Sequence, residues 1–389
     1  MIGIDKINFY TPNIYMDLVD LANHRNIEPT KFTVGIGQSK MAVPPITQDT
    51  VSMGANAAYP IISDEDKQLI DLIVVGTESG IDESKSTASF IHQLLDIQPF
   101  AKSIEVKQAC YGATAGLMTA LDFVTLNPEK KALVIGSDIS RYGLQTSGEV
   151  TQGAGAVAMV ISHSPRILEI NRDSVAMTEN IFDFWRPNYY DTAIVDGKFS
   201  NEAYMSFFKK LWEEYRRRHN MTFDDFEAFC FHLPYSKMGK KALLPLLEHE
   251  AMATKERLLA NYDLSTYYTK LVGNIYTGSL YLSLMSLLDQ GTQLKQGQKI
   301  GFFSYGSGAV GEIFSGTLVE GFRQHLLTDT LTALVDNRKA LSIDEYETIF
   351  NERLPQTDGV HMIHSNYDHH SRFILSSIHN HQRHYTQQF

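Results

Sequence analysis

Short apolar runs alternate with stretches of helical spacing along most of the chain, and this alternation limits its fold more than any other feature. Apolar runs bounded by Gly or polar residues are typical of strands covered on both faces. The predicted strands are Leu72–Gly76, Ile104–Val106, Ala132–Gly136, Ala156–Ile161, Phe229–His232 and Ile300–Ser304. The predicted helices are Thr87–Leu95, Ala113–Leu126, Asn201–His219, Gly239–Leu247 and Gly278–Leu288. Strands that alternate with helices predict an α/β fold with layered sheets.

The chain is long enough to hold two halves of similar structure. It has 389 residues, and domains usually hold roughly 100–200 residues. The strings GAGAVAMVI (153–161) and GSGAVGEIF (306–314) share a Gly-x-Gly-Ala-Val core, and an apolar strand precedes each. This echo indicates that one half is a divergent copy of the other. The polar, Pro-containing string HSPR favours a boundary near residue 165, which gives the halves 1–165 and 166–389.

Charge and composition exclude several classes of protein. The formal net charge of −11 argues against nucleic acid or an anionic membrane as the partner, because both favour a basic face. The start of the chain, MIGIDKINFYTPNIY, lacks the pattern of a signal peptide and is typical of a first strand. No uninterrupted apolar run reaches the roughly 18 residues of a membrane helix. The two cysteines, Cys110 and Cys230, fit a reducing compartment, so we expect a cytoplasmic protein.

The C-terminal end of the chain is rich in histidine. Seven of the fourteen histidines lie in the last thirty residues: His361, His364, His369, His370, His379, His381 and His384. A metal site requires ligands at organised spacings, and this segment lacks them. The pattern therefore favours a solvated terminal strand and tail, and we expect no metal site.

Cys110 is the candidate nucleophile. The segment SIEVKQACYGATAGLMTALDFV predicts a strand, a tight turn at Cys110 and a helix, with small residues just after the cysteine. A helix start stabilises a thiolate through its free amide groups, so we expect a lowered thiol pKa. The alternative is a buried structural cysteine. Cys230 has no helix start behind it and is interpreted as core packing.

His232 and Asn274 are the next candidates. His232, in FHLPYSKMGKK, follows a predicted strand, and α/β sites usually form at strand ends. Its imidazole could move the thiol proton, or it could be a hydrogen-bonded core histidine. Asn274, in VGNIYTGSLY, leads into a predicted helix, and its amide could position a carbonyl or orient the imidazole.

A Gly-rich turn and one carboxylate complete the candidate chemistry. In FFSYGSGAVGEIF (302–314), the amide of Ser307 is placed to face an oxyanion together with the amide of Cys110. The turn lacks the patterns of phosphate-binding loops. Glu78 follows the strand in VVGTESG and is either a solvated loop residue or a base whose pKa is raised by burial.

A basic cluster of Lys237, Lys240 and Lys241 follows His232. Lys237 and Lys241 are four residues apart and therefore share one face of a helix. That face could hold an anionic tail such as a CoA phosphate, or it could be an ordinary solvated helix end.

Long strings of the chain resemble those of the 3-hydroxy-3-methylglutaryl-CoA (HMG-CoA) synthase family in its bacterial form. They are GIGQSKM, VGTESGIDESKS, ACYGATAG, TQGAGAVAM, FDFWRP, VDGKFS, FHLPYSKMGKKAL, GNIYTGSLYLSL and FSYGSGAVGE. The resemblance spans residues 2 to 320 and continues more loosely to the end. It implies a thiolase-like fold, with two α/β halves stacked as αβαβα layers, and a homodimer.

The resemblance also implies an activity in the mevalonate pathway of isoprenoid synthesis, namely the condensation of acetyl-CoA with acetoacetyl-CoA and water to HMG-CoA and CoA. Cys110 would accept the acetyl group, Glu78 would act as general base and acid, and His232 would polarise the second substrate. The matching ligand-contact positions are Thr151, Ser200, Lys237, Lys241, Asn274 and Ser307. No metal or cofactor would be needed. Ser147 stands where some relatives carry Asn, which is a mild departure near the acyl end.

Two other functions remain open from the sequence. One is a β-ketoacyl-carrier-protein synthase or a thiolase, which makes a linear product. A β-ketoacyl synthase also obtains its carbanion by decarboxylation, without a base such as Glu78. The other is a non-catalytic protein that binds acyl-CoA on the same scaffold.

Overall fold

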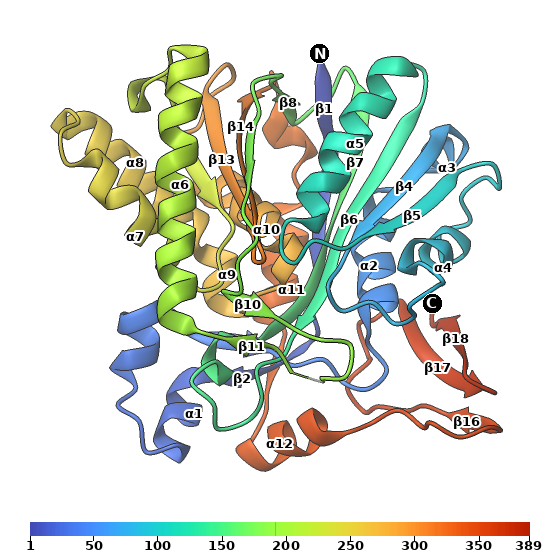
Figure 1. Ribbon diagram of the computed structural model, residues 1–389. Helices are drawn as coiled ribbons and strands as arrows, with labels where there is room; N and C mark the ends of the chain where they lie inside the picture. The colour runs from blue at the N-terminus through green and yellow to red at the C-terminus, as the bar shows by residue number, and fades with distance from the viewer. Residues whose placement is uncertain (191) are drawn as a thin grey trace.

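The computed structural model describes residues 1–190 and 192–389. Within them, ten strands form one mixed sheet in the order β12-β13-β14-β8-β1-β7-β6-β4-β5, with β9 beside β14 (Figure 1). These strands are β1 (Ile2–Tyr10), β4 (Ile70–Gly76), β5 (Lys102–Val106), β6 (Lys131–Ser140), β7 (Gly153–His163), β8 (Leu168–Ile170), β9 (Val175–Thr178), β12 (Ala228–Phe231), β13 (Lys299–Gly306) and β14 (Val310–Leu318). Each of the six predicted strands lies within one of them or ends one residue beyond it.

The strand pattern occurs twice in this sheet. In the first part, β4 and β6 are parallel, β7 is antiparallel to β6, and β1 is antiparallel to β7. In the second part, β12 and β13 are parallel, β14 is antiparallel to β13, and β8 is antiparallel to β14. The two parts join where β1 pairs with β8. The string 153–161 lies in β7, and the string 306–314 spans the turn before β14 and the first residues of β14, the strand that corresponds to β7 in the second part.

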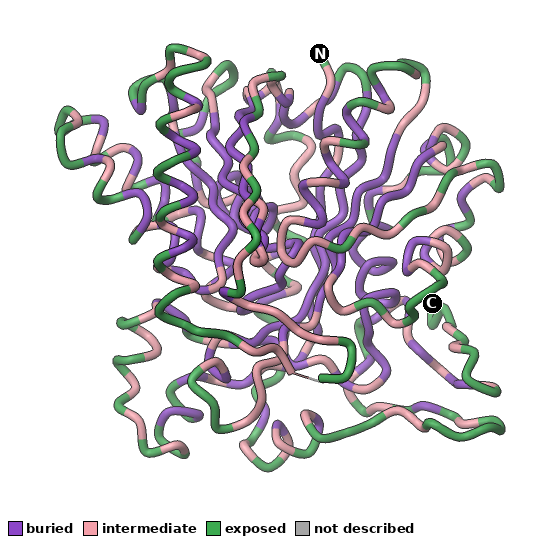
Figure 2. The backbone as a smooth tube through the Cα atoms, in the orientation of Figure 1, coloured by how far each residue is buried: buried purple, intermediate pink, exposed green. Residues whose placement is uncertain are grey.

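Helices cover both faces of each part of the sheet, which gives the expected layers. The central helices are α5 (Gly112–Leu126) and α10 (Ser279–Gln290), and both contribute to one apolar cluster with the inner faces of the strands. The outer helices are α2 (Thr50–Ala58) and α4 (Thr87–Leu94) on the first part, and α6 (Gly197–His219) and α7 (Met238–Leu243) on the second. Figure 2 shows the buried strands between these helices.

Alternation of side chains along the strands explains the layers. Phe302 packs in the central cluster with α10, whereas its neighbour Phe303 packs in the outer cluster with α6. Along β4, Val74 faces the central cluster and Val75 faces α2 and α4. Successive residues of a strand point to opposite faces, so a strand that is apolar throughout must be covered on both.

The remaining elements lie around this core. They are β2 (Ile14–Asp17), β3 (Lys40–Ala42), β10 (Phe184–Trp185), β11 (Ile194–Val195), β15 (Lys339–Ala340), β16 (Val360–Met362), β17 (Phe373–His379), β18 (Gln382–Gln387), α1 (Leu18–His24), α3 (Asp64–Leu69), α8 (Met252–Ser265), α9 (Tyr267–Val272), α11 (Thr328–Asp336) and α12 (Ile343–Asn351). The histidine-rich end forms the small sheet β16–β18. Among residues 1–190 and 192–389, no group of three or more His, Cys, Asp and Glu residues is arranged to hold a metal ion.

One segment departs from the expectation that no part of the chain could cross a membrane. Ala109–Leu126, which includes α5, is long and apolar enough by length and composition alone. Half of this segment is buried inside the protein, and α5 packs at the centre of the layers. The core helix of a layered protein is apolar for this reason.

Candidate active site

Cys110 and Glu78 lie against each other at the ends of neighbouring elements of the first half. Glu78 follows β4, and Cys110 lies just before α5. The thiol of Cys110 donates a hydrogen bond of 3.2 Å to Oε1 of Glu78. A Cβ atom on Gly76 would lie 2.2 Å from the amide nitrogen of Ala113, so only glycine lets the start of α5 approach β4 this closely. The pairing follows from this close approach.

The pKa of Cys110 is not lowered as the helix-start argument predicted. Burial and the adjacent Glu78 carboxylate raise the pKa of the thiol well above its ordinary value. Burial, with the charge of Asp138 adding to it, raises the pKa of Glu78 to about 8. The prediction was wrong because burial away from water and a neighbouring negative charge raise the thiol pKa by more than the helix start lowers it. The thiol therefore stays protonated near neutral pH and points its proton at Glu78.

Asp138, on β6, holds the backbone of Glu78 in place. It is fully buried, and its Oδ1 accepts hydrogen bonds of 2.9 Å from Thr77 Oγ1, Glu78 N and Ser79 Oγ. Its Oδ2 accepts from the amide and the hydroxyl of Thr277, at 3.1 and 2.6 Å. Sequence reasoning missed this residue, whose one visible signal was an acidic side chain two residues after the predicted strand Ala132–Gly136. A carboxylate with five donors is a rigid anchor.

His232 lies directly after β12 and is buried. Its backbone is fixed, because its amide donates to Phe303 O at 2.9 Å and its carbonyl accepts from the Tyr204 hydroxyl at 2.7 Å. Among the described residues, its ring atom Nδ1 has no hydrogen-bond partner. Burial lowers the pKa of His232 to about 3. The imidazole is therefore neutral at physiological pH and can donate or accept one hydrogen bond at each nitrogen.

Asn274 presents a hydrogen-bond donor in a fixed orientation. Its Oδ1 accepts from Tyr276 N and from Ser279 Oγ, both at 2.9 Å. These two donors assign the oxygen, so the amide nitrogen points the other way, toward the Tyr142 hydroxyl at 3.4 Å. Asn274 is buried and can position a carbonyl oxygen.

The turn that carries Ser307 lies against the turn that carries Cys110. A Cβ atom on Gly306 would lie 2.4 Å from the carbonyl oxygen of Gln108, so a side chain there would push the two turns apart. Gln108 Nε2 also donates to the carbonyl of Ser307 at 3.4 Å. On the other side, the amide of Gly308 donates to Asp183 at 2.9 Å. The two candidate oxyanion amides thus come from turns that touch.

A cavity of roughly 300 Å³ joins most of the predicted site residues. Those that line it are Cys110, Thr151, Ser200, His232, Lys241, Asn274 and Ser307. Lys237 does not line the cavity. It lies next to the lining, because its amide donates a hydrogen bond to the carbonyl of Ile36, and Ile36 lines the cavity. Glu78 meets the site through Cys110. The cavity also has an aromatic wall that sequence reasoning did not identify: Tyr142, Phe184, Tyr204, Tyr235, Tyr276 and Tyr305.

Comparison with known proteins gives a consistent result over the whole chain. The family described as hydroxymethylglutaryl-coenzyme A synthase N terminal matches residues 1–165, and its C-terminal counterpart matches residues 170–262 and 246–386. The chain is 54% identical over 353 residues to the hydroxymethylglutaryl-CoA synthase of Enterococcus faecalis, which covers 91% of this chain and 92% of that one. The chain belongs to the hydroxymethylglutaryl-CoA synthase family.

Solved structures of this family have the same fold. A crystal structure of HMG-CoA synthase complexed with CoA superposes with a TM-score of 0.96 at 44% identity, covering 99% of both chains. The structure of MvaS in complex with 3-hydroxy-3-methylglutaryl coenzyme A gives a TM-score of 0.88 at 32% identity, again over 99% of both chains. The predicted thiolase-like α/β fold is confirmed, and the chain is an acyl-condensing enzyme of the HMG-CoA synthase type.

Two lysines of the predicted basic cluster, Lys240 and Lys241, differ in what they contact in this family member. Lys241 Nζ donates to the Tyr235 hydroxyl at 2.9 Å, and that hydroxyl donates to Asn201 Oδ1 at 3.0 Å. Lys240 instead pairs with Asp263 at 3.2 Å on the surface. Lys241 therefore belongs to the cavity, and Lys240 does not.

Cys230 is the second thiol of the chain. It is fully buried in the central apolar cluster, as predicted, and burial raises its pKa to about 12. It has no place in the lining of the cavity.

Proposed function

We propose that this chain forms an acetyl thioester on Cys110 and condenses it with acetoacetyl-CoA to give HMG-CoA, within the mevalonate pathway. The contact between the Cys110 thiol and Glu78 Oε1 carries the proposal. A thiol beside a carboxylate, at a cavity that also holds a neutral imidazole and a fixed amide, suits carbon–carbon bond formation from an unactivated acetyl group.

The first step is acetyl transfer. The sulfur of Cys110 attacks the carbonyl carbon of acetyl-CoA, the bond to the CoA sulfur breaks, and free CoA leaves with the proton of the thiol. Negative charge gathers on the carbonyl oxygen in the transition state. The amides of Cys110 and Ser307 would stabilise that oxygen, because fixed donors are most effective where charge develops.

The second step forms the new carbon–carbon bond. Glu78, in its ionised form, removes a proton from the methyl group of acetyl-Cys110. The resulting carbon attacks the 3-carbonyl carbon of acetoacetyl-CoA, and His232 donates a hydrogen bond to the carbonyl oxygen. The alkoxide takes up the proton that Glu78 holds, which returns Glu78 to its ionised form. Asn274 would hold a thioester carbonyl in position.

The third step releases the product. Water attacks the carbonyl carbon of the thioester on Cys110, the carbon–sulfur bond breaks, and HMG-CoA leaves with a free carboxyl group. The thiol of Cys110 is restored. These three steps need no cofactor, since CoA thioesters are the substrates.

The walls of the cavity suit a CoA thioester. Lys241 and, outside the lining, Lys237 would attract the phosphates of the ligand. Ser200 and Thr151 would contact its pantetheine arm.

We also propose that the protein acts in the cytoplasm as a homodimer, in which the edge strand β5 of one protomer meets β5 of its partner. Residues 1–165 and 166–389 would be its two duplicated halves. Light scattering, with β5 disrupted by Ile104→Pro, tests the dimer.

Intact-mass analysis after incubation with acetyl-CoA tests the central proposal. An acetyl adduct is expected in the wild type and in Cys230→Ala, and its loss is expected in Cys110→Ala. Labelled acetyl-CoA with acetoacetyl-CoA should then give a branched six-carbon product. A linear product would indicate a ketoacyl synthase or a thiolase, and the absence of an adduct in the wild type would indicate a binding protein.

A further inference from the structure

The loop between β6 and β7 forms one wall of the active-site cavity. Five of its residues line the cavity: Tyr142, Ser147, Gly148, Val150 and Thr151. Its backbone is left-handed at Gly143, with φ of 95°, and at Gln145, with φ of 59°. A left-handed conformation is unfavourable for a residue such as glutamine, so other groups must hold the loop in this shape.

Two side chains of the loop itself bind its backbone. Gln152 Oε1 accepts hydrogen bonds from the amides of Tyr142 and Gly143, at 2.8 and 3.1 Å. Glu149 Oε2 accepts from the amide of Gln145 at 2.8 Å. Gln152 and Glu149 thus fix the segment that carries Tyr142, and each binds the amide of one of its two left-handed residues.

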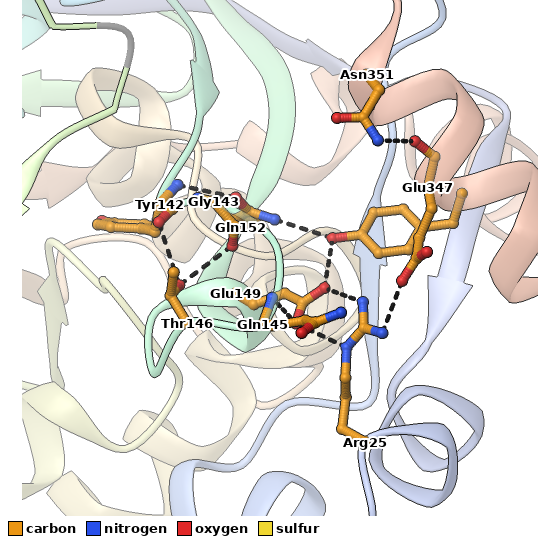
Figure 3. A network of polar contacts seen from close by, with 10 residues as sticks. Arg25, Tyr142, Gly143, Gln145, Thr146, Glu149, Gln152, Glu347 and Asn351 are labelled. Atoms are coloured by element: carbon orange, nitrogen blue, oxygen red, sulfur yellow. Dashed lines mark hydrogen bonds and ion pairs between the residues drawn. The ribbon is translucent and has the colours of Figure 1, made fainter.

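Two residues from distant parts of the chain hold Glu149 and Gln152 in turn (Figure 3). Arg25, at the end of α1, donates to both carboxylate oxygens of Glu149, at 2.8 and 3.1 Å, and pairs with Glu347 of α12 at 2.6 Å. The hydroxyl of Tyr346, also on α12, donates to Glu149 at 3.2 Å and accepts from Gln152 Nε2 at 3.1 Å. The loop is therefore connected to α1 and α12 through continuous hydrogen bonds.

Burial makes this network different from an ordinary surface ion pair. The side chains of Arg25 and Glu149 are only 9% and 4% exposed. A buried ion pair contributes little net stability, because the loss of water offsets most of the attraction, but it does define one geometry. Every partner of Glu149 is a donor, so the carboxylate is satisfied in this arrangement and in few others.

The residue that this network positions is Tyr142. The amide nitrogen of Asn274 points at the Tyr142 hydroxyl, at 3.4 Å. A Cβ atom on Gly148 would lie 2.7 Å from Cβ of Tyr142, so the loop folds back directly onto this side chain. A shift of the loop would therefore move Tyr142 and open the wall of the cavity that also contains Cys110.

We infer that Arg25 and Tyr346 are positioning residues, which hold the loop 141–152 closed so that acetyl-Cys110 meets its acceptor rather than bulk water. The inference rests on the proposed function. Neither residue lines the cavity, and both act through Glu149 and Gln152. When either is removed, the loop opens more often, and water cleaves the acetyl thioester before condensation.

The test is the partition of acetyl-Cys110 between water and acetoacetyl-CoA in Tyr346→Phe and Arg25→Met. Acetyl-CoA that is hydrolysed without condensation is compared with branched product formed. For Tyr346→Phe, which removes the hydrogen bonds to Glu149 and from Gln152, the ratio of hydrolysis to condensation should rise roughly five- to hundredfold, the range that follows from two lost hydrogen bonds. Hydrogen exchange at the amides of Tyr142, Gly143 and Gln145 should quicken, while exchange in β6 and β7 stays as in the wild type.

Tyr367→Phe is the matched control. The Tyr367 hydroxyl donates to Glu345 of the same helix α12 at 3.1 Å, and within the described part of the chain no hydrogen bond joins it to the loop. Its partition ratio and loop exchange should equal those of the wild type. A general loss of folded enzyme would lower hydrolysis and condensation together and leave their ratio unchanged.

An unchanged ratio and unchanged loop exchange in Tyr346→Phe would overturn the inference, as would an equal rise in Tyr367→Phe. If Arg25→Met does not fold, Tyr346→Phe decides alone, because it removes a single oxygen atom. Failure of the proposed function would be seen separately, in wild-type enzyme that forms no acetyl-Cys110 or no branched product.

Discussion

The two halves of the sheet repeat one strand pattern, yet they supply opposite kinds of chemistry to the same cavity. The first half provides Cys110 and Glu78, whose pKa values are raised. The second half provides His232, whose pKa is lowered to about 3, and the Ser307 turn. One physical cause, burial, produces both results, because it always disfavours the charged form. The acids of the first half therefore hold their protons to a higher pH than usual, and the base of the second half loses its proton at a lower pH than usual.

This comparison assigns proton exchange to the first half and fixed hydrogen-bond donation to the second. A carboxyl with a pKa of about 8 can give up and regain a proton near physiological pH. An imidazole with a pKa of about 3 stays neutral throughout that range, so it can only donate or accept hydrogen bonds. Substitutions in each half test this division.

Glu78→Gln should have the largest effect. The amide keeps the shape of the side chain but cannot take a proton from the acetyl methyl group, so condensation should fall by about a thousandfold. Acetylation should survive, because the carboxylate that raises the pKa of Cys110 is gone. Intact-mass analysis measures the fraction of enzyme that is acetylated, and product formation from acetoacetyl-CoA measures the condensation rate. If acetylation fell as far as condensation, Glu78 would act in the first step as well.

His232→Asn should have the next largest effect. Losing a fixed donor at a carbonyl oxygen costs about a hundredfold in condensation, with acetylation little changed. In the wild type, the rate should show no transition near the usual histidine pKa, since His232 stays neutral down to about pH 3. Rates measured between pH 5 and 7 test this point. A histidine transition that disappeared in the variant would show that His232 exchanges protons, and the division between the halves would be lost.

The sequence predicted the elements of the core well. The strand β6 extends beyond Ala132–Gly136 by a few residues at one end, and α5 begins one residue before Ala113. Buried strands and central helices have strong apolar patterns, and these patterns are local. The prediction that Cys110 is the nucleophile rests on its local setting in the same way.

What the sequence could not predict depends on pairs far apart in the chain. Asp138 holds Glu78 and Thr277, and Arg25 meets Glu149 across 124 positions. The lowered pKa expected for Cys110 was wrong for the same reason, since the burial of the thiol and the contact with Glu78 both depend on segments distant in the chain. Spacing along the chain carries no signal for such contacts, whereas a helix start is visible locally.

Asp138→Asn should move the pH dependence of condensation. Glu78 must be ionised to act as a base, so the condensation rate rises as the pH increases through its pKa, about 8 in the wild type. The charge of Asp138 raises that pKa, and removing the charge lowers it. The rising limb should therefore shift to lower pH. The midpoint of the limb is the measurement, because it does not depend on how much enzyme is active.

Two outcomes would contradict this account of Asp138. One is a midpoint that stays near that of the wild type in Asp138→Asn. The other is the same rising limb in Glu78→Gln, which would assign it to a different group. The asparagine also places an amide nitrogen among the five donors that Asp138 now accepts, so a lower thermal stability of the variant is expected.

Lys241→Met should give the smallest effect, on substrate binding alone. Lys241 lines the cavity, and a partly exposed charge facing a CoA phosphate contributes a roughly two- to fivefold change in KM. The effect should shrink at high salt, because ions screen exposed charges. Lys240→Met removes the same charge from a lysine paired with Asp263, so its KM should match that of the wild type. Equal rises in KM for both variants would mean that net charge attracts the substrate, and that this wall of the second half provides no specific contact.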